Sequence, residues 1–292
     1  DTDNESIYCV KSLKSIIVDP ENPNFCSKDG VLYNKSMTML IKYPSSKEDT
    51  EFVIPESVTE LNSRAFYECS NLKSITLPKN LKAIGAYAFS DCNELGTLMV
   101  NTEIIPNRAF ASCFKKETIN GSTLTLGSNV KSIGDSAFSD CTYLSSVTIP
   151  STVTTIENYA FFVTGLTSIT IPNNVKTLGG NTFNFCYNLK NVYLSNNLVT
   201  IGAWCFGMCI NLESIDLKNI ENIDYAAFYG CSNMGTITIP SSVKSINSTS
   251  FYGCYFERNK FINYSSAKGY PWSVKTFDTI QEDGLCISGT TA

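Results

Sequence analysis

The sequence predicts a solenoid, a right-handed superhelix of stacked turns that is mostly β-structure. Three observations predict it: a unit of about 23 residues recurs, every unit repeats the same apolar positions, and each unit holds one short alternating stretch. One such unit cannot bury its own apolar set, whereas stacked units cover one another. We expect successive strands to pair in parallel in one sheet on the concave side, with short 3₁₀ or irregular turns on the convex side.

Each unit centres on a phenylalanine that is followed three residues later by cysteine. The phenylalanines are Phe66, Phe89, Phe110, Phe138, Phe161, Phe183, Phe206, Phe228 and Phe251, in steps of 23, 21, 28, 23, 22, 23, 22 and 23. The cysteines are Cys69, Cys92, Cys113, Cys141, Cys186, Cys209, Cys231 and Cys254, and Thr164 stands in the remaining unit. Since the chain holds only 12 cysteines, this placement is not chance.

The full unit reads A-F-x-x-C-x-x-L-x-x-I-x-I-P-x-x-V-x-x-I-G. Its I-x-I step alternates as a half-buried strand does. Proline cannot donate to a strand ladder, so it ends the strand in four units, at Pro78, Pro150, Pro172 and Pro240. The stretch from Phe to Leu is too short for a stable helix. Extra residues between Cys113 and Leu124 are expected to form a loop away from the strand.

Composition narrows the function classes. The chain has 292 residues, is 43% apolar and 17% charged, and carries a net charge of −5. No basic run is present, so nucleic acid is not an expected partner. No apolar stretch reaches the roughly 18 residues of a membrane span. The chain starts at Asp1, which we interpret as a mature or trimmed secreted product. It has no histidine, which removes the commonest general base and metal ligand.

The segment LKSITLPKNLKAIGAYAFSDCNEL resembles the BspA-like class of leucine-rich repeats, which occurs in surface proteins of gut and oral bacteria and in some parasitic protists. The resemblance covers about Leu13 to Phe251, and it implies an α/β-type leucine-rich repeat solenoid. It also implies a cell-surface or secreted protein that adheres to host matrix or to other cells, without catalysis. Such a protein would be extracellular, a monomer, and without a cofactor.

The two flanks also resemble parts of such proteins. Val18 to Pro44 is similar to a module near their start, and NKSM is expected to form the turn of a hairpin. The segment NYSSAKGYPWSVKTF is similar to their closing segment. We therefore expect an N-terminal flank with a partial repeat and hairpin module over 1–50, a solenoid of about nine turns over 51–254, and a C-terminal cap and tail over 255–292.

The cysteines allow three interpretations. Zinc is disfavoured because only Cys205 and Cys209 are close in sequence. Disulfides between adjacent turns remain possible, since stacking could bring the Cα atoms within about 4.4–6.8 Å. Free, buried thiols are favoured, because Thr164 replaces one member and cysteine packs well as a small apolar residue. The cysteines outside the repeat are the likelier exceptions to free, buried thiols; they are Cys9, Cys26, Cys205 and Cys286. Of these, Cys205 lies beside Trp204 and is expected in the core.

Strand residues between the apolar ones should face outward and form a serine and threonine surface. Two neighbouring units depart from this serine and threonine pattern. They carry Lys190, Asn191 and Tyr193, then Glu213, Ser214 and Asp216. A solvated charge pair beside a surface tyrosine explains these residues. The sharper hypothesis is that they bind a protein partner, because exposed aromatic and charged residues are what binding surfaces use.

Tyrosines beside the repeat phenylalanine are a second candidate surface, although half-buried packing also explains them. They are Tyr67, Tyr87, Tyr159, Tyr229 and Tyr252. No G-x-S-x-G, phosphate-binding loop or G-x-G-x-x-G is present, so no catalytic site is predicted. The expected function is non-catalytic protein binding or adhesion. Carbohydrate binding and a passive spacer role are the alternatives.

Overall fold

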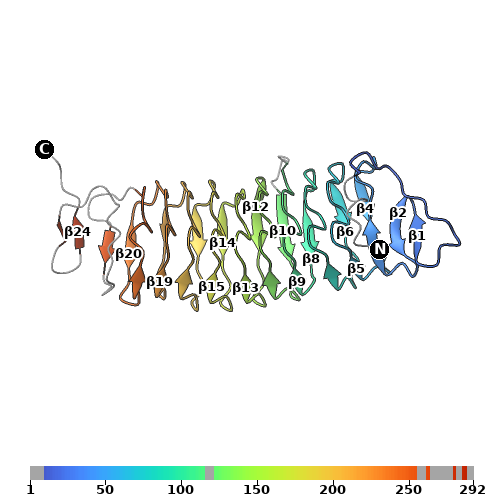
Figure 1. Cartoon of the computed structure of the whole chain (residues 1–292). Coiled ribbons are helices and arrows are strands. Elements are labelled where there is room, and N and C mark those ends of the chain that lie inside the picture. The colour runs from blue at the N-terminus through green and yellow to red at the C-terminus, as the bar shows by residue number, and fades with distance from the viewer. Residues whose placement is uncertain (1–9, 116–121, 255–260, 264–278, 281–284, 288–292) are drawn as a thin grey trace.

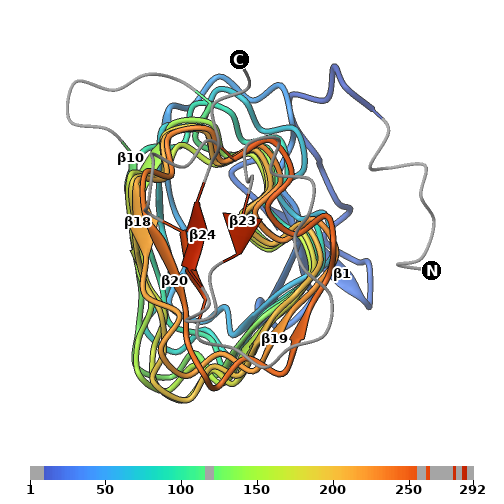
Figure 2. The ribbon, with the colours of Figure 1, turned by 90° about the vertical axis from the view of Figure 1, so that its left-hand side faces the viewer.

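The computed structural model describes residues 10–115 and 122–254, and the backbone of three strands near the C-terminal end. The turns stack side by side along one axis, from an N-terminal hairpin sheet to a small C-terminal sheet (Figure 1). Viewed along that axis, the turns superimpose and enclose a common core (Figure 2). The predicted leucine-rich repeat solenoid is therefore the fold of this chain.

The first set of parallel strands contains the I-x-I steps. Its members are β4 (Glu51–Val53), β6 (Ser74–Thr76), β8 (Leu98–Val100), β10 (Ser122–Leu126), β12 (Leu144–Thr148), β14 (Ser168–Thr170), β16 (Asn191–Tyr193), β18 (Ser214–Ile215) and β20 (Ile237–Ile239). Hydrogen bonding divides this set into β4-β6, β8-β10-β12 and β14-β16-β18, while β20 joins the C-terminal sheet. Pro78, Pro150, Pro172 and Pro240 each follow closely on the strand of their unit, as predicted.

The expectation of a single sheet is wrong, because a second set of parallel strands forms the other wall of the solenoid. Its members are β5 (Glu60–Leu61), β7 (Ala83–Ile84), β9 (Ile104–Ile105), β11 (Ser132–Ile133), β13 (Thr155–Ile156), β15 (Thr177–Leu178), β17 (Thr200–Ile201), β19 (Asn222–Ile223) and β21 (Ser245–Ile246). From β9 to β21 this set is one unbroken seven-stranded sheet. It arises from the last apolar position of each unit, where two residues suffice for pairing once the turns are stacked.

The outer turns contain no helix in the described residues, so they are irregular rather than helical and the α-component of the expected type is absent. They too hydrogen-bond from turn to turn: Phe66 N–H donates to Ala88 O at 2.7 Å. Most units hold two residues with left-handed backbone, two positions before and two after the phenylalanine; Arg64 and Glu68 are the first such pair. With this backbone, N–H groups of the outer turn point toward the following unit and C=O groups point toward the preceding one.

Each end of the stack carries its own sheet. The predicted hairpin consists of β2 (Val31–Asn34) and β3 (Met39–Lys42), and β1 (Phe25–Lys28) pairs antiparallel with β2. β3 then continues in parallel with β5. At the other end β22 (Phe261–Asn263) pairs with β20, and β24 (Leu285–Ile287) joins β22 to β23 (Thr279–Ile280). Both open ends of the solenoid are thereby paired with further strands.

The core is a column of phenylalanine rings. Phe66 and Phe89 stack with centroids 5.0 Å apart, and the same arrangement continues to Phe228 and Phe251 at 5.1 Å. Tyr43 stacks on Phe66 at 5.3 Å and so begins the column in the N-terminal flank. All nine repeat phenylalanines are fully buried. One continuous core therefore runs the length of the solenoid.

Candidate functional site

The outward face of the first strand set is mainly serine and threonine, as the sequence indicates. In β6, Ile75 is buried while Ser74 and Thr76 are exposed. The same alternation repeats from strand to strand, and Thr97 and Thr123 of neighbouring turns place their hydroxyls 3.3 Å apart. These two outward rows form a regular polar surface.

The six residues of the predicted patch lie together on this face. Asn191 lies opposite Ser214 in the register of β16 and β18. The next residue of β16, the buried Val192, lies opposite Ile215. Lys190 and Glu213 precede these strands, and Glu213 N–H donates to Lys190 O at 3.4 Å. All six side chains are exposed. We call this set, Lys190, Asn191, Tyr193, Glu213, Ser214 and Asp216, the β16–β18 patch.

Tyr193 and Asp216 border a hollow of about 130 Å³. Tyr193 is 62% exposed, in a row where most other turns carry threonine. Asp216 accepts a hydrogen bond from Lys218 N–H at 3.0 Å, and its other carboxylate oxygen lies 3.8 Å from Lys218 Nζ. The apolar part of the lining consists of Val192, Leu194, Leu198 and Ile220. The patch thus combines an exposed ring, opposite charges and a small apolar recess.

A shorter turn accounts for this hollow. Nine positions separate Val192 from Ile201, but only eight separate Ile215 from Ile223, because the connection between the two strands loses one residue. The unit also has Lys218 where others have proline. The hollow lies at this shorter connection, which lines it with Asp216, Lys218 and Asn219.

A second hollow on the same face was missed by sequence reasoning. It has a volume of about 510 Å³ and lies between β6 and β8, bordered by Met99, Thr76 and Leu77. Met99 is 65% exposed. Here only seven positions separate Leu98 from Ile105, so the connection is shorter by two residues. That deletion is the signal that could have located the hollow.

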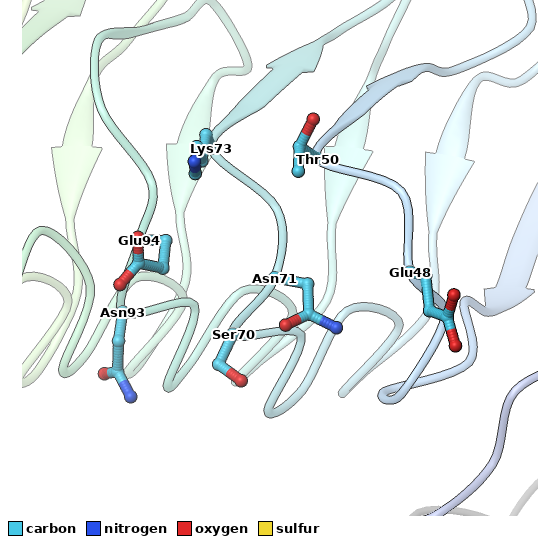
Figure 3. Close-up of a pocket in the computed structure, with 7 residues that line it drawn as sticks. All are labelled: Glu48, Thr50, Ser70, Asn71, Lys73, Asn93 and Glu94. Carbon is cyan, nitrogen blue, oxygen red and sulfur yellow. The ribbon is translucent and has the colours of Figure 1, made fainter.

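A third, wide-open hollow of about 590 Å³ lies on the shoulder of the first turns (Figure 3). Its lining is polar and carries charges of both signs: Glu48, Thr50, Ser70, Asn71, Lys73, Asn93 and Glu94. Asn71 Nδ2 donates to Lys47 O at 3.0 Å, and Glu48 pairs with Lys14 at 2.8 Å. Asn93 Oδ1 is buried without a hydrogen-bond partner. The hollow has no aromatic wall and no recess in which to enclose a ligand.

The tyrosines of the second candidate surface lie on the outer turns, but they do not form one cluster. Tyr87 lies between two guanidinium groups, 5.4 Å from Arg64 and 5.8 Å from Arg108. Tyr229 and Tyr252 stack on each other at 5.2 Å, whereas Tyr159 contacts Phe162 edge-on at 5.5 Å. Tyr67 is half-buried, and burial raises its pKa.

The repeat cysteines in the described residues are free and buried. From Cys92 onward their thiols donate to the carbonyl of the phenylalanine one turn earlier: Cys92 Sγ lies 3.1 Å from Phe66 O, and Cys113 Sγ lies 2.9 Å from Phe89 O. Cys69 Sγ instead lies 3.8 Å from Tyr43 O. Sequence reasoning assigned these residues to apolar packing and missed this donor role. Thr164 differs, because its hydroxyl donates to Phe161 O of its own turn at 3.1 Å rather than to the phenylalanine of the turn before.

The cysteines outside the repeat positions differ in environment. Cys205 is fully buried at the position of the repeat alanine, in agreement with its expected place in the core. Cys26 is half-buried, and its Sγ donates to Asn34 O at 3.2 Å. Cys9 lies outside the described residues, and only the backbone of Cys286 is described.

Burial keeps the repeat thiols from Cys69 to Cys231 protonated. It raises the pKa of Cys186 to about 11, and it raises the pKa values of Cys69 and Cys92 well above their ordinary range. A thiol held in this form is a poor nucleophile and metal ligand. Within the described residues, no three His, Cys, Asp or Glu side chains gather as a metal site. Nor does that part of the chain contain a helix long and apolar enough to cross a bilayer.

The stacked core, the paired turns and the Phe-Cys unit define a leucine-rich repeat protein. The chain belongs to the BspA-type leucine-rich repeat family, whose repeat region matches in six copies over residues 43–161, 111–233 and 205–270. No curated protein sequence matches the chain.

Solved structures share this fold. A leucine-rich repeat protein from Eubacterium ventriosum aligns over 96% of this chain and 59% of its own, with 23% identity and a TM-score of 0.51. A leucine-rich repeat protein from T. pallidum aligns over 60% of this chain and 82% of its own, with 25% identity and a TM-score of 0.52. The chain therefore spans less than two thirds of the length of the E. ventriosum protein.

Proposed function

We propose that this chain is part of a non-catalytic extracellular or cell-surface protein that binds a protein partner, and that it serves in adhesion to host matrix or host cells. It acts as a monomer, and the β16–β18 patch carries the contact. The family resemblance supports the surface location. The buried thiols fit it as well, because their raised pKa values slow oxidation in an oxidising environment.

The observation that carries this proposal is the exposure of Tyr193 beside the recess that it shares with Asp216. A tyrosine that is 62% exposed offers a large contact area with little side-chain entropy to lose. The recess can receive one apolar side chain of a partner, and the charges around it can fix orientation. Elsewhere the face is mainly serine and threonine, and the larger hollow beside Met99 has no aromatic ring in its lining.

The experiment measures binding of the whole chain to immobilised fibronectin, laminin and type IV collagen. We expect one or more of them to bind, and the double variant Tyr193→Ala, Asp216→Ala to bind at least about tenfold more weakly. The control variant is Thr148→Ala, Thr170→Ala, which alters the same face away from the recess. Equal binding by both double variants would remove the patch from the proposal, and no binding to any matrix protein would contradict the adhesive role.

Carbohydrate binding and a spacer role are the competing functions. A passive spacer predicts an outer surface without specialised positions. The β16–β18 patch departs from that expectation, since ring, charges and recess coincide on two adjacent turns.

A further inference from the structure

Both walls of the solenoid lose their strand pairing at the same junction. In the first set, β6 ends one ladder and β8 begins the next (Figure 1), and in the second set β7 and β9 belong to different sheets. The first set is also interrupted after β12 and after β18, but there the second set continues. Among the described turns from β4 to β21, only this junction is unpaired on both walls. We call it the seam; it separates the turn of β6 and β7 from the turn of β8 and β9.

On the second wall, the seam coincides with a proline that lacks a donor. The residue after a strand of this set typically donates its N–H to the last residue of the preceding strand, as Gly134 does to Ile105 O at 2.8 Å. At the seam this position is Pro106, which has no N–H and so leaves Ile84 O without this bond. In the other described turns the position always has an N–H; its residues are Asn62, Gly85, Gly134, Glu157, Gly179, Gly202, Asp224 and Asn247.

On the first wall, the seam coincides with the shortened connection. Only seven positions separate Leu98 from Ile105, against nine from Ile75 to Ile84 in the preceding turn. The hollow of about 510 Å³ lies where these two unequal connections meet, and both turns contribute to its lining. The two walls are thus unpaired at one junction for two separate reasons, a deletion and a proline.

The outer turns and the core remain continuous across the seam. Phe89 N–H donates to Ala109 O at 2.8 Å, and Asp91 N–H donates to Ala111 O at 2.9 Å. The rings of Phe89 and Phe110 stack with centroids 5.0 Å apart. The seam is therefore closed along the outer turns and unpaired along both walls. A hinge has this geometry, because a few residues along one line take up the motion of two rigid parts.

We propose that the seam is a hinge, at which the part of the solenoid from the N-terminal sheet to β7 swings against the remaining turns about the outer turns. This opening breaks no strand ladder, whereas opening at any other junction between β4 and β21 breaks a ladder on at least one wall. Hinge motions of this kind occur on the microsecond to millisecond timescale. The swing widens the hollow beside Met99 and changes the angle between the N-terminal sheet and the β16–β18 patch. It is independent of the proposed protein contact, so either can fail without the other.

The test measures distances between two spin labels in the full chain by double electron–electron resonance. The labels are attached to p-acetylphenylalanine, so that the native cysteines stay unmodified. Two pairs of exposed positions cross the seam on the walls: Val53 with Thr170 on the first set, and Glu60 with Thr177 on the second. Each pair spans five turns, roughly 24 Å at the ordinary strand spacing, which the method can measure.

Three further pairs, each also spanning five turns, are the controls. Two lie beyond the seam, one on each wall, and the third crosses the seam on the outer turns. They are Thr125 with Thr238, Ser132 with Ser245, and Tyr87 with Trp204. We expect the two wall pairs that cross the seam to give distance distributions roughly twofold broader than those of the controls, extended toward longer distances.

A point variant should close the second wall. Pro106→Asn supplies the missing donor, because Asn62 and Asn247 occupy the same position and each donates its N–H to the preceding turn at 3.0 Å. We expect this variant to pair β7 with β9 and to narrow the second-wall distribution across the seam to the width of its control. Pro150→Asn, in a turn away from the seam, is the matched variant and should leave that distribution unchanged.

Three results would overturn the proposal. They are wall distributions across the seam that are as narrow as the controls, an outer-turn distribution as broad as those of the walls, and an unchanged second-wall distribution in the folded Pro106→Asn variant. Thermal melting of each labelled chain shows that the fold is retained, and the four wall pairs in the chain with Pro106 test the hinge without any change at the seam.

Discussion

The rings of Phe161 and Phe183 stack with centroids 5.5 Å apart and planes 1° from parallel. This contact joins two turns whose units differ, because the unit of Phe161 has Thr164 in place of cysteine and one residue fewer before its strand. The column of rings continues unchanged through this irregularity. Ring stacking therefore sets the position of each turn on the next, and the connections adjust to it.

The first prediction concerns this column. Phe161→Ala should lower the free energy of unfolding by about 3–5 kcal/mol, because it opens a cavity between two stacked rings. Phe162→Ala, at the adjacent half-buried position, should cost much less, since that ring has only edge-on contacts with Tyr159 and Phe185. Urea unfolding of both variants measures the difference. Similar losses in the two variants would mean that the column does not hold the turns together.

The second prediction concerns alkaline pH. Burial raises the pKa of Cys186 to about 11 and that of Cys92 well above its ordinary value of 9.0. The folded chain therefore keeps these protons while the unfolded chain releases them. Their contribution to stability is complete below pH 9 and is lost as the pH rises above it, by about 1.4 kcal/mol per pH unit for each thiol.

Unfolding by guanidinium between pH 7 and 10.5, under reducing conditions, measures this loss. Cys186→Thr should make the decline with pH shallower by the share of one thiol, even if the variant is less stable at pH 7. Stability that stays flat above pH 9, or an unchanged slope in the variant, would show that the thiols are not protected as the structure indicates.

The third prediction isolates the thiol-to-carbonyl hydrogen bond. Cys141 Sγ donates to Phe110 O at 3.1 Å. Threonine and valine side chains have the same shape, but of the variants Cys141→Thr and Cys141→Val only the threonine variant has a donor. Thr164 uses that donor on Phe161 O of its own turn, whereas Cys141 bonds Phe110 O of the turn before. We expect the threonine variant to be more stable by about 1 kcal/mol. Denaturation of the two variants tests this, and a more stable valine variant would mean that the position requires only apolar volume.

The fourth prediction concerns Val163, whose backbone is left-handed at φ 54°. This conformation is costly for a β-branched residue, and two later turns have Gly230 and Gly253 at the same position. Val163→Gly and Val163→Ala both remove the side chain, but only glycine relieves the backbone. The glycine variant should therefore be the more stable by about 1 kcal/mol, as thermal unfolding can show. The opposite order would indicate that the turn is unstrained.

Much of the fold could be predicted from the sequence because the same apolar core positions recur in every unit. The phenylalanine column and the strands of the first set follow from positions that recur in each unit. The second strand set could not be predicted in this way. A two-residue strand such as β7 has no alternation to detect, and it exists only because Leu61 and Ile84 are aligned by stacking.

The N-terminal end of the column shows another limit. Lys42 occupies the position of the repeat alanine beside Tyr43 and is only 1% exposed. Its ammonium group donates to Arg64 O at 3.3 Å and to Tyr67 O at 3.2 Å, and burial lowers its pKa. A lysine in a flank gives no sequence signal for such a role, because the carbonyls it satisfies belong to the following turn.

The candidate site was predictable only in part. The exposed residues of the β16–β18 patch follow from the strand alternation and from their departure from serine and threonine. The recess beside Tyr193 does not, since it depends on the difference in length between two neighbouring connections. The same holds for the hollow beside Met99, which also lies at a shorter connection.

Photo-cross-linking from position 193 tests the proposed function most directly. Tyr193 is replaced by p-benzoylphenylalanine, with matched probes at Thr148 on the same face and at Thr155 on the second sheet, and each chain is irradiated with the matrix protein that the unaltered chain binds. We predict a cross-link from position 193 that excess unaltered chain suppresses, and little or none from the other two positions. A cross-link of equal yield from position 155, or none from position 193, would contradict the account.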